Sequence, residues 1–93
     1  AFVCANDFHA IHMLNVLKRH GLYVPDDVMI VGFDNAPETR IIDPNITTAN
    51  IPSTDIGIQA AEILLARISN PERSYVSCYV KTTPIFRSST QPK

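Results

Sequence analysis

The chain has 93 residues and a mass of 10.3 kDa; 45% of its residues are hydrophobic and 18% are charged. Domains usually contain about 100 to 150 residues, so residues 1–93 are expected to form a single domain or a piece of one. The formal net charge is −1 and the basic residues are scattered, which excludes a chain that holds nucleic acid by itself.

The start of the sequence, its apolar runs and its cysteines indicate the cellular compartment of the chain. Ala1 opens inside an apolar run without an initiating methionine, which predicts an excised piece of a longer protein. No apolar run approaches the roughly 20 residues of a membrane span, so we expect a soluble chain. Cys4 and Cys78 lie far apart without metal or redox spacing, which favours free thiols and the cytoplasm.

The first half of the chain predicts a strand, a helix and a second strand. The short apolar run 2–5 is typical of a buried strand, and Asp7 is expected to cap the helix that follows. That helix ends near His20, with Gly21 in the C′ position, and its apolar residues recur at three-residue spacing: Phe8, Ile11, Leu14 and Leu17. The nearly continuous apolar run 28–33 predicts a strand covered on both faces.

The second half begins with a loop over residues 34–46, since proline, asparagine and aspartate break every regular pattern there. Residues 47–49 are expected to add a short strand. A second helix should follow Pro52, with a hydroxyl cap, and should stop at Asn70-Pro71. Alternation over residues 75–81 predicts another strand, with residues 85–88 pairing to it as a hairpin.

This order of elements predicts an α/β fold. Strands that alternate with helices form right-handed crossovers, which give a parallel sheet covered by helices. The expected architecture is therefore three layers, helix, parallel sheet and helix.

Polar pairs follow two of the predicted strands and are the best candidates for a site. Asn6-Asp7 and Asp34-Asn35 should meet at the carboxyl edge of the sheet, where open α/β folds bind ligands. Carboxylate and amide groups suit a small polar ligand. From spacing alone, the alternative is that Asp7 is only a helix cap and Asp34 only a turn residue.

Catalytic and metal sites are not predicted. The sequence has no nucleophile elbow, phosphate-binding glycine loop or dinucleotide fingerprint, and Ser53 is better explained as a helix cap than as a nucleophile. His9 and His12 are three residues apart, but no cysteine pair or carboxylate at ligand spacing accompanies them. We therefore expect neither an enzyme, nor a metal, nor a cofactor.

Five separated motifs carry a resemblance to a known family. They are Val3-Cys4-Ala5-Asn6-Asp7, the run from Gly21 to Val28, the run from Ile30 to Asn35, the set Ile46-Thr47-Thr48 with Pro52 and Gly57, and Arg87-Ser88-Ser89-Thr90. In this order and spacing, the whole chain resembles the lactose/galactose-repressor family of bacterial transcription regulators.

The resemblance implies a place for the chain in a larger protein. The family has an N-terminal helix-turn-helix DNA reader and an effector module shaped like a periplasmic sugar-binding protein, and this chain is similar to the C-terminal part of that module. It implies effector contacts at Asn6, Asp34, Ser53 and Ile56. It also implies a homodimer interface that comprises Phe8, Ile11, His12, Arg40 and Ile41.

Three positions depart from the family pattern. Asn35 stands where a second aspartate is common, Ser53 where a bulky residue often sits, and Asn50 where a basic residue is frequent. The implied effector class is a sugar or sugar derivative, with a nucleobase as the other possibility. A periplasmic sugar-binding protein of an uptake system is the alternative function, and operator DNA is expected to bind only through an upstream domain.

Overall fold

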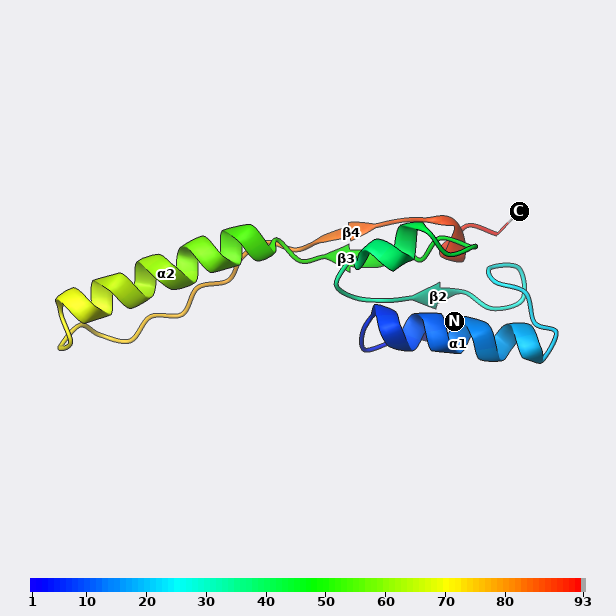
Figure 1. The fold of residues 1–93 in the computed structure, drawn as a ribbon, viewed down its shortest axis with the longest axis horizontal. Helices are drawn as coiled ribbons and strands as arrows, with labels where there is room; N and C mark the ends of the chain where they lie inside the picture. Colours follow the sequence, from blue (N-terminus) through cyan, green and yellow to red (C-terminus); the bar gives the residue numbers. More distant parts are fainter. Residues whose placement is uncertain (93) are drawn as a thin grey trace. The chain divides into compact units, whose positions relative to one another are not determined.

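The computed structural model describes residues 1–92, which divide into two compact units. Unit 1 comprises residues 1–51 and the described residues from Thr83 onward, and unit 2 comprises Pro52–Thr82. Figure 1 shows the elements of each unit along the chain. Among residues 1–92, no helix combines the length and the apolar character that a membrane crossing requires.

Helix α1 (Asp7–Arg19) lies where the three-residue spacing predicts it. Its N-cap is Asn6, whose Oδ1 accepts a hydrogen bond from His9 N at 2.9 Å, so the expectation that Asp7 is the cap is wrong. Gly21 follows the helix with φ 71°, and Leu22 N donates to Leu17 O at 3.0 Å, which closes the C-terminus as predicted.

The strands of unit 1 form two pairs. β1 (Phe2–Val3) pairs in parallel with β2 (Ile30–Val31), and β3 (Thr48–Asn50) pairs antiparallel with β4 (Thr83–Ile85). Isolated parallel bridges, Val31↔Thr47 and Asp34↔Asn50, join the two pairs. The pairing of β1 with β2 is parallel, as predicted, whereas β4 runs antiparallel to β3.

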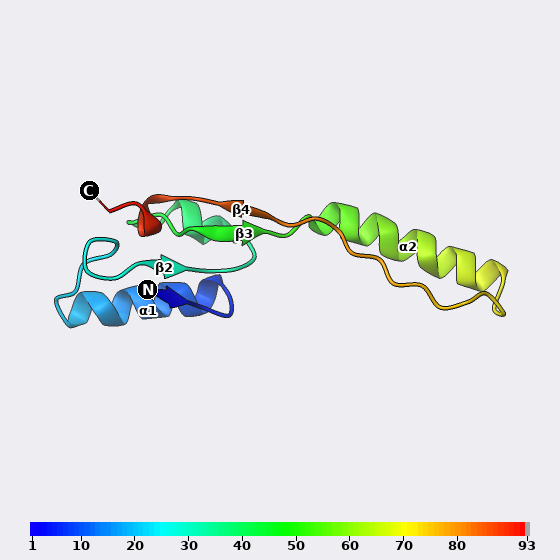
Figure 2. The same cartoon turned by 180° about the vertical axis from the view of Figure 1, so that it is seen from behind.

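The core of unit 1 lies between α1 and the strands. Figures 1 and 2 both show α1 running alongside β2, and the buried apolar side chains come from these elements and from the segment that enters β3. They are Ala10, Leu14, Leu17, Ile30 and Ile46. Two short 3-10 helices, η1 (Pro37–Arg40) and η2 (Ser88–Thr90), flank this core.

Unit 2 consists of helix α2 (Ser53–Ser69) and the segment that follows it. The helix spans the predicted residues, but its N-cap is Pro52 and no side chain caps it, so the expected hydroxyl cap is wrong. Arg67 donates to Ser74 O at 3.3 Å, and its guanidinium lies 4.8 Å from the centre of the Tyr75 ring. These contacts hold the returning segment to the end of the helix.

The strand predicted over residues 75–81 is absent, and so is its hairpin with residues 85–88. A strand needs a neighbouring backbone for its hydrogen-bond ladder, and residues 75–81 have none within residues 1–92. Cys78, Tyr79 and Val80 instead line a hollow against α2. Ile85 belongs to β4 and pairs with Thr48.

Candidate functional site

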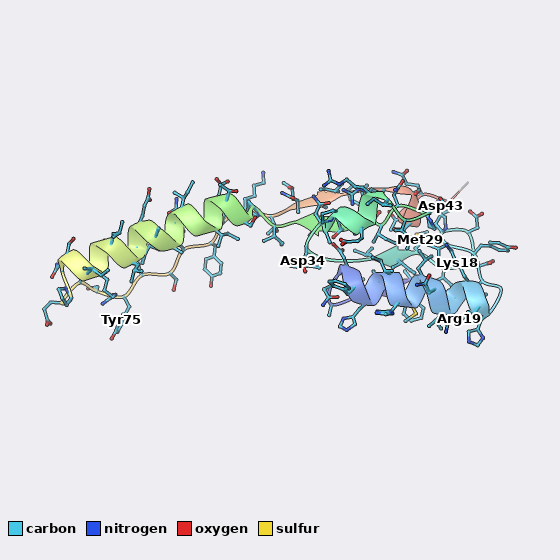
Figure 3. The ribbon with its side chains drawn as sticks, in the orientation of Figure 1. Lys18, Arg19, Met29, Asp34, Asp43 and Tyr75 are labelled. Atoms are coloured by element: carbon cyan, nitrogen blue, oxygen red, sulfur yellow. The ribbon has the colours of Figure 1, made fainter. Side chains whose placement is uncertain are left out.

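Asp34 follows the carboxyl end of β2. Its backbone N donates to Ala49 O at 3.1 Å, and its side chain is exposed. Figure 3 shows Asp34 at the end of unit 1 where α1 begins, whereas Lys18 and Asp43 lie where α1 ends. The predicted position of Asp34 at the carboxyl edge of the strands is thus the observed one.

The backbone at Asp34 and Asn35 has an unusual conformation. Their φ angles are 114° and 58°, in the region that favours glycine, although neither residue is glycine. Such conformations cost of the order of 1 to 3 kcal/mol each and persist only where the surroundings enforce them. Asn35 N donates to Thr48 Oγ1 at 3.2 Å, and Asn35 Nδ2 donates to Asn50 Oδ1 at 3.0 Å. Strand β3 therefore helps to enforce the turn.

The buried carboxylate of Asp7 connects the elements that form this edge. Asp7 is 1% exposed; its Oδ1 accepts from Thr48 Oγ1 at 2.8 Å and its Oδ2 accepts from Ala36 N at 2.6 Å. Gly32 passes so close that a Cβ on it would collide with the Asp7 carboxylate. Asp7 thus joins α1 to the loop after β2 and to β3, and both of its carboxylate oxygens accept hydrogen bonds within unit 1.

Asn6 lies at the same edge as Asp34. It follows β1, which is parallel to β2, and Asp7 N donates to Phe33 O at 3.0 Å, so residues 6–7 lie beside residues 33–34. The side chain of Asn6 is half-buried and its Oδ1 is used by the helix cap. Its Nδ2 is the atom suited to a ligand, and a ligand contact at Asn6 stays a prediction.

Sequence analysis assigned no role in the site to Arg87. It follows β4, and its guanidinium donates to Asn35 Oδ1 at 2.7 Å, to Thr39 Oγ1 at 2.8 Å and to Ile46 O at 3.0 Å. Arg87 belongs to one of the five motifs of the family resemblance, but no spacing rule connects it to Asn35, which lies 52 positions earlier in the sequence. It belongs to the network that carries Asp34 and Asn35.

The remaining predicted ligand residues, Ser53 and Ile56, lie in the first turn of α2 in unit 2. Both side chains are exposed, Ile56 by 41%. A common pocket for these two residues and for Asn6 and Asp34 stays a prediction.

The predicted dimer residues lie at the surface of unit 1, which a partner could cover. Phe8 is 68% exposed and Ile41 is 81% exposed. His12 and Arg40 are also exposed, and Ile11 is half-buried. The interface itself stays a prediction.

A cavity in unit 1 lies away from Asp34. Its volume is about 600 Å³, and its lining includes Lys18, Tyr23, Pro25, Asp43 and Gln91. None of the predicted ligand residues lines it, so its size does not make it the candidate site. Within residues 1–92, no group of three or more histidine, cysteine or acidic side chains is placed to hold a metal ion.

The chain matches the family of periplasmic binding protein-like domains over residues 1–90. Among curated proteins, it is 47% identical over 68 residues to the arabinose metabolism transcriptional repressor of Geobacillus stearothermophilus, covering 73% of this chain and 19% of the relative. It is 32% identical over 89 residues to the ribose operon repressor of Haemophilus influenzae, covering 96% of this chain and 27% of the relative.

A solved structure agrees with these relatives. The LacI family transcriptional regulator from Enterococcus faecium, crystallised with bound ribose, aligns with a TM-score of 0.84 and 31% identity over 98% of this chain and 34% of that one. The chain belongs to the periplasmic binding protein-like family and, within it, to the lactose/galactose repressors. It spans about a fifth to a quarter of the curated relatives' length. The α/β fold class is confirmed, and these relatives are repressors, not enzymes.

Proposed function

We propose that this chain is the effector-sensing and dimerisation part of a bacterial DNA-binding transcriptional regulator, and that its effector is a sugar. The carrying observation is the exposed Asp34 carboxylate at the carboxyl edge of two parallel strands, fixed by a turn that the surrounding side chains enforce. A carboxylate accepts hydrogen bonds from two hydroxyl groups, which polyhydroxylated ligands supply.

The names of the relatives support the same class of effector. Two of them regulate arabinose or ribose genes, and the Enterococcus faecium regulator holds ribose. Their description as repressors favours a cytoplasmic regulator over the alternative, a periplasmic binding protein of an uptake system. Asn6, Ser53 and Ile56 complete the proposed effector contacts, and operator DNA would bind to a helix-turn-helix domain upstream.

Titration calorimetry on the intact regulator tests the effector proposal, with D-ribose, L-arabinose and a purine base as ligands. We expect a sugar to bind, and Asp34→Ala to remove charge-assisted hydrogen bonds worth about 1.5 to 3 kcal/mol each, a loss of roughly tenfold to a hundredfold per bond. Glu72→Ala, which removes an exposed carboxylate in unit 2, is the control. Unchanged affinity in a folded Asp34→Ala protein, or binding of the purine alone, would contradict the proposal.

The dimer proposal has its own test. Phe8, Ile11, His12, Arg40 and Ile41 would meet the same surface of a second copy, because two-fold dimers use one patch on both subunits. Ile41→Asp would place a charge in that contact and should shift the intact regulator from dimer to monomer in sedimentation velocity. A monomeric wild-type protein at tens of micromolar would refute the interface.

A further inference from the structure

The backbone of Arg87 is held in place by the hydroxyl group of Thr47. The Thr47 hydroxyl oxygen lies 2.8 Å from Arg87 N and 3.1 Å from Arg87 O, and Thr47 is only 3% exposed. The same hydroxyl lies 2.6 Å from Thr90 Oγ1. The start of the side chain is therefore fixed relative to strand β3.

The guanidinium of Arg87 is then held in two directions. Nη1 donates to Thr39 Oγ1 in η1 and to Ile46 O before β3, while Nη2 donates to Asn35 Oδ1 in the loop after β2. All three acceptors are neutral oxygens. The contacts therefore depend on the planar, forked arrangement of the guanidinium N–H groups and not on pairing with an opposite charge. A lysine ammonium is a single point and does not reproduce such a fork.

Arg87 decides which way the Asn35 amide faces. Because Oδ1 accepts from Arg87, Nδ2 is turned to Asn50 Oδ1 at 3.0 Å. Asn35 N is held by Thr48 Oγ1 at the same time. Asn35 is thus fixed at φ 58°, and it adjoins Asp34, whose own φ is 114°.

We propose that Arg87 is a positioning residue of the effector site, which holds Asn35 and thereby the turn that presents the Asp34 carboxylate. This inference rests on the effector role proposed for Asp34. Arg87 does not touch the effector; it limits the directions that the Asp34 carboxylate takes before an effector arrives, so less order has to be imposed on binding.

The first test measures effector affinity in the intact regulator. Arg87→Lys keeps the charge but loses the fork, and we expect it to weaken D-ribose binding about tenfold. Asn35→Ala should give a similar loss, and the double variant should lose little more than either single variant, because both single changes break the hydrogen bond between Arg87 and Asn35. Arg19→Lys, the same change at an exposed site in the last turn of α1, should bind like wild type.

The second test needs no ligand. Hydrogen exchange followed by mass spectrometry reports on the amides of Asp34 and Asn35, which donate to Ala49 O and Thr48 Oγ1. We expect Arg87→Lys to accelerate exchange at these amides about tenfold. The amides of Phe2 and Cys4, which bond to Met29 O and Val31 O, should keep their rates.

The outcomes separate the two proposals. If no sugar binds to wild type, or Asp34→Ala binds normally, the effector proposal fails, and hydrogen exchange still decides whether Arg87 holds the turn. If Arg87→Lys leaves the exchange rates of the Asp34 and Asn35 amides unchanged, or accelerates exchange equally at all amides, Arg87 is not a positioning residue. Selective acceleration with unchanged D-ribose affinity would overturn its link to effector binding.

Discussion

Replacing Asp7 with alanine should be among the most damaging single changes in unit 1. The carboxylate is 1% exposed and accepts from the Thr48 hydroxyl and from Ala36 N. Alanine accepts neither hydrogen bond, so the buried Thr48 hydroxyl and the half-buried Ala36 N would both lose their acceptor. The change also removes the acidic side chain from the first turn of α1.

The size of the loss follows from these contacts. A buried donor without an acceptor costs about 1 to 3 kcal/mol, and an acid near a helix N-terminus contributes about 0.3 to 1 kcal/mol. Two such donors and the helix-end contribution together predict that Asp7→Ala lowers the free energy of unfolding by about 2 to 7 kcal/mol. Against a typical total of about 5 to 15 kcal/mol, this is a large fraction.

Asp7→Asn separates the hydrogen bonds from the shape of the side chain. Its Oδ1 can accept from Ala36 N, and its Nδ2 can donate to the Thr48 hydroxyl, which is able to accept. We expect about half of the loss caused by alanine. Urea unfolding of the intact regulator, followed by circular dichroism, gives both values. A loss below about 1 kcal/mol for Asp7→Ala would refute the assigned role of the carboxylate.

Two further predictions concern neighbouring positions. Gly32→Ala should lower the free energy of unfolding by about 1 to 3 kcal/mol in the same urea experiment. The added Cβ would collide with the Asp7 carboxylate, which two hydrogen bonds hold in place. A variant as stable as wild type would show that Asp7 can move. Burial raises the pKa of the Cys4 thiol, so its alkylation by iodoacetamide should be slower in the folded protein than in urea and should begin at higher pH. Equal rates in both states, measured by mass spectrometry, would show that the thiol is not shielded.

The sequence was most informative where periodicity and end signals agreed. Helices α1 and α2 occupy the predicted residues because apolar spacing and Gly21 or Asn70-Pro71 mark them locally. The position of Asp34 at a strand end was likewise predictable from the apolar run before it. The strand predicted at residues 75–81 is absent from the structure. Alternation of side chains describes the two faces of a segment, but it does not show whether a partner strand is present.

The support of the candidate site was hidden from the sequence for a different reason. Asp7 bonds to Thr48, which is 41 positions away in the sequence, and Arg87 bonds to Asn35, which is 52 positions away. Asn35 in turn bonds to Thr48 and so connects the two contacts. Local patterns carry no information on such pairings. Asp7 looked like a helix cap because aspartate after a strand serves that role well, but Asn6 precedes it and takes the cap.

The antiparallel pairing of β3 and β4 makes residues 52–82 an insertion in topological terms. The chain leaves unit 1 after Ile51 and re-enters at Thr83, which pairs directly with Asn50. Residues paired in an antiparallel ladder are only about 5 Å apart, a span that a two-residue hairpin turn closes. All five buried apolar residues of the core lie outside the insertion. A substitution within residues 52–82 is therefore expected to leave the packing of these five side chains unchanged.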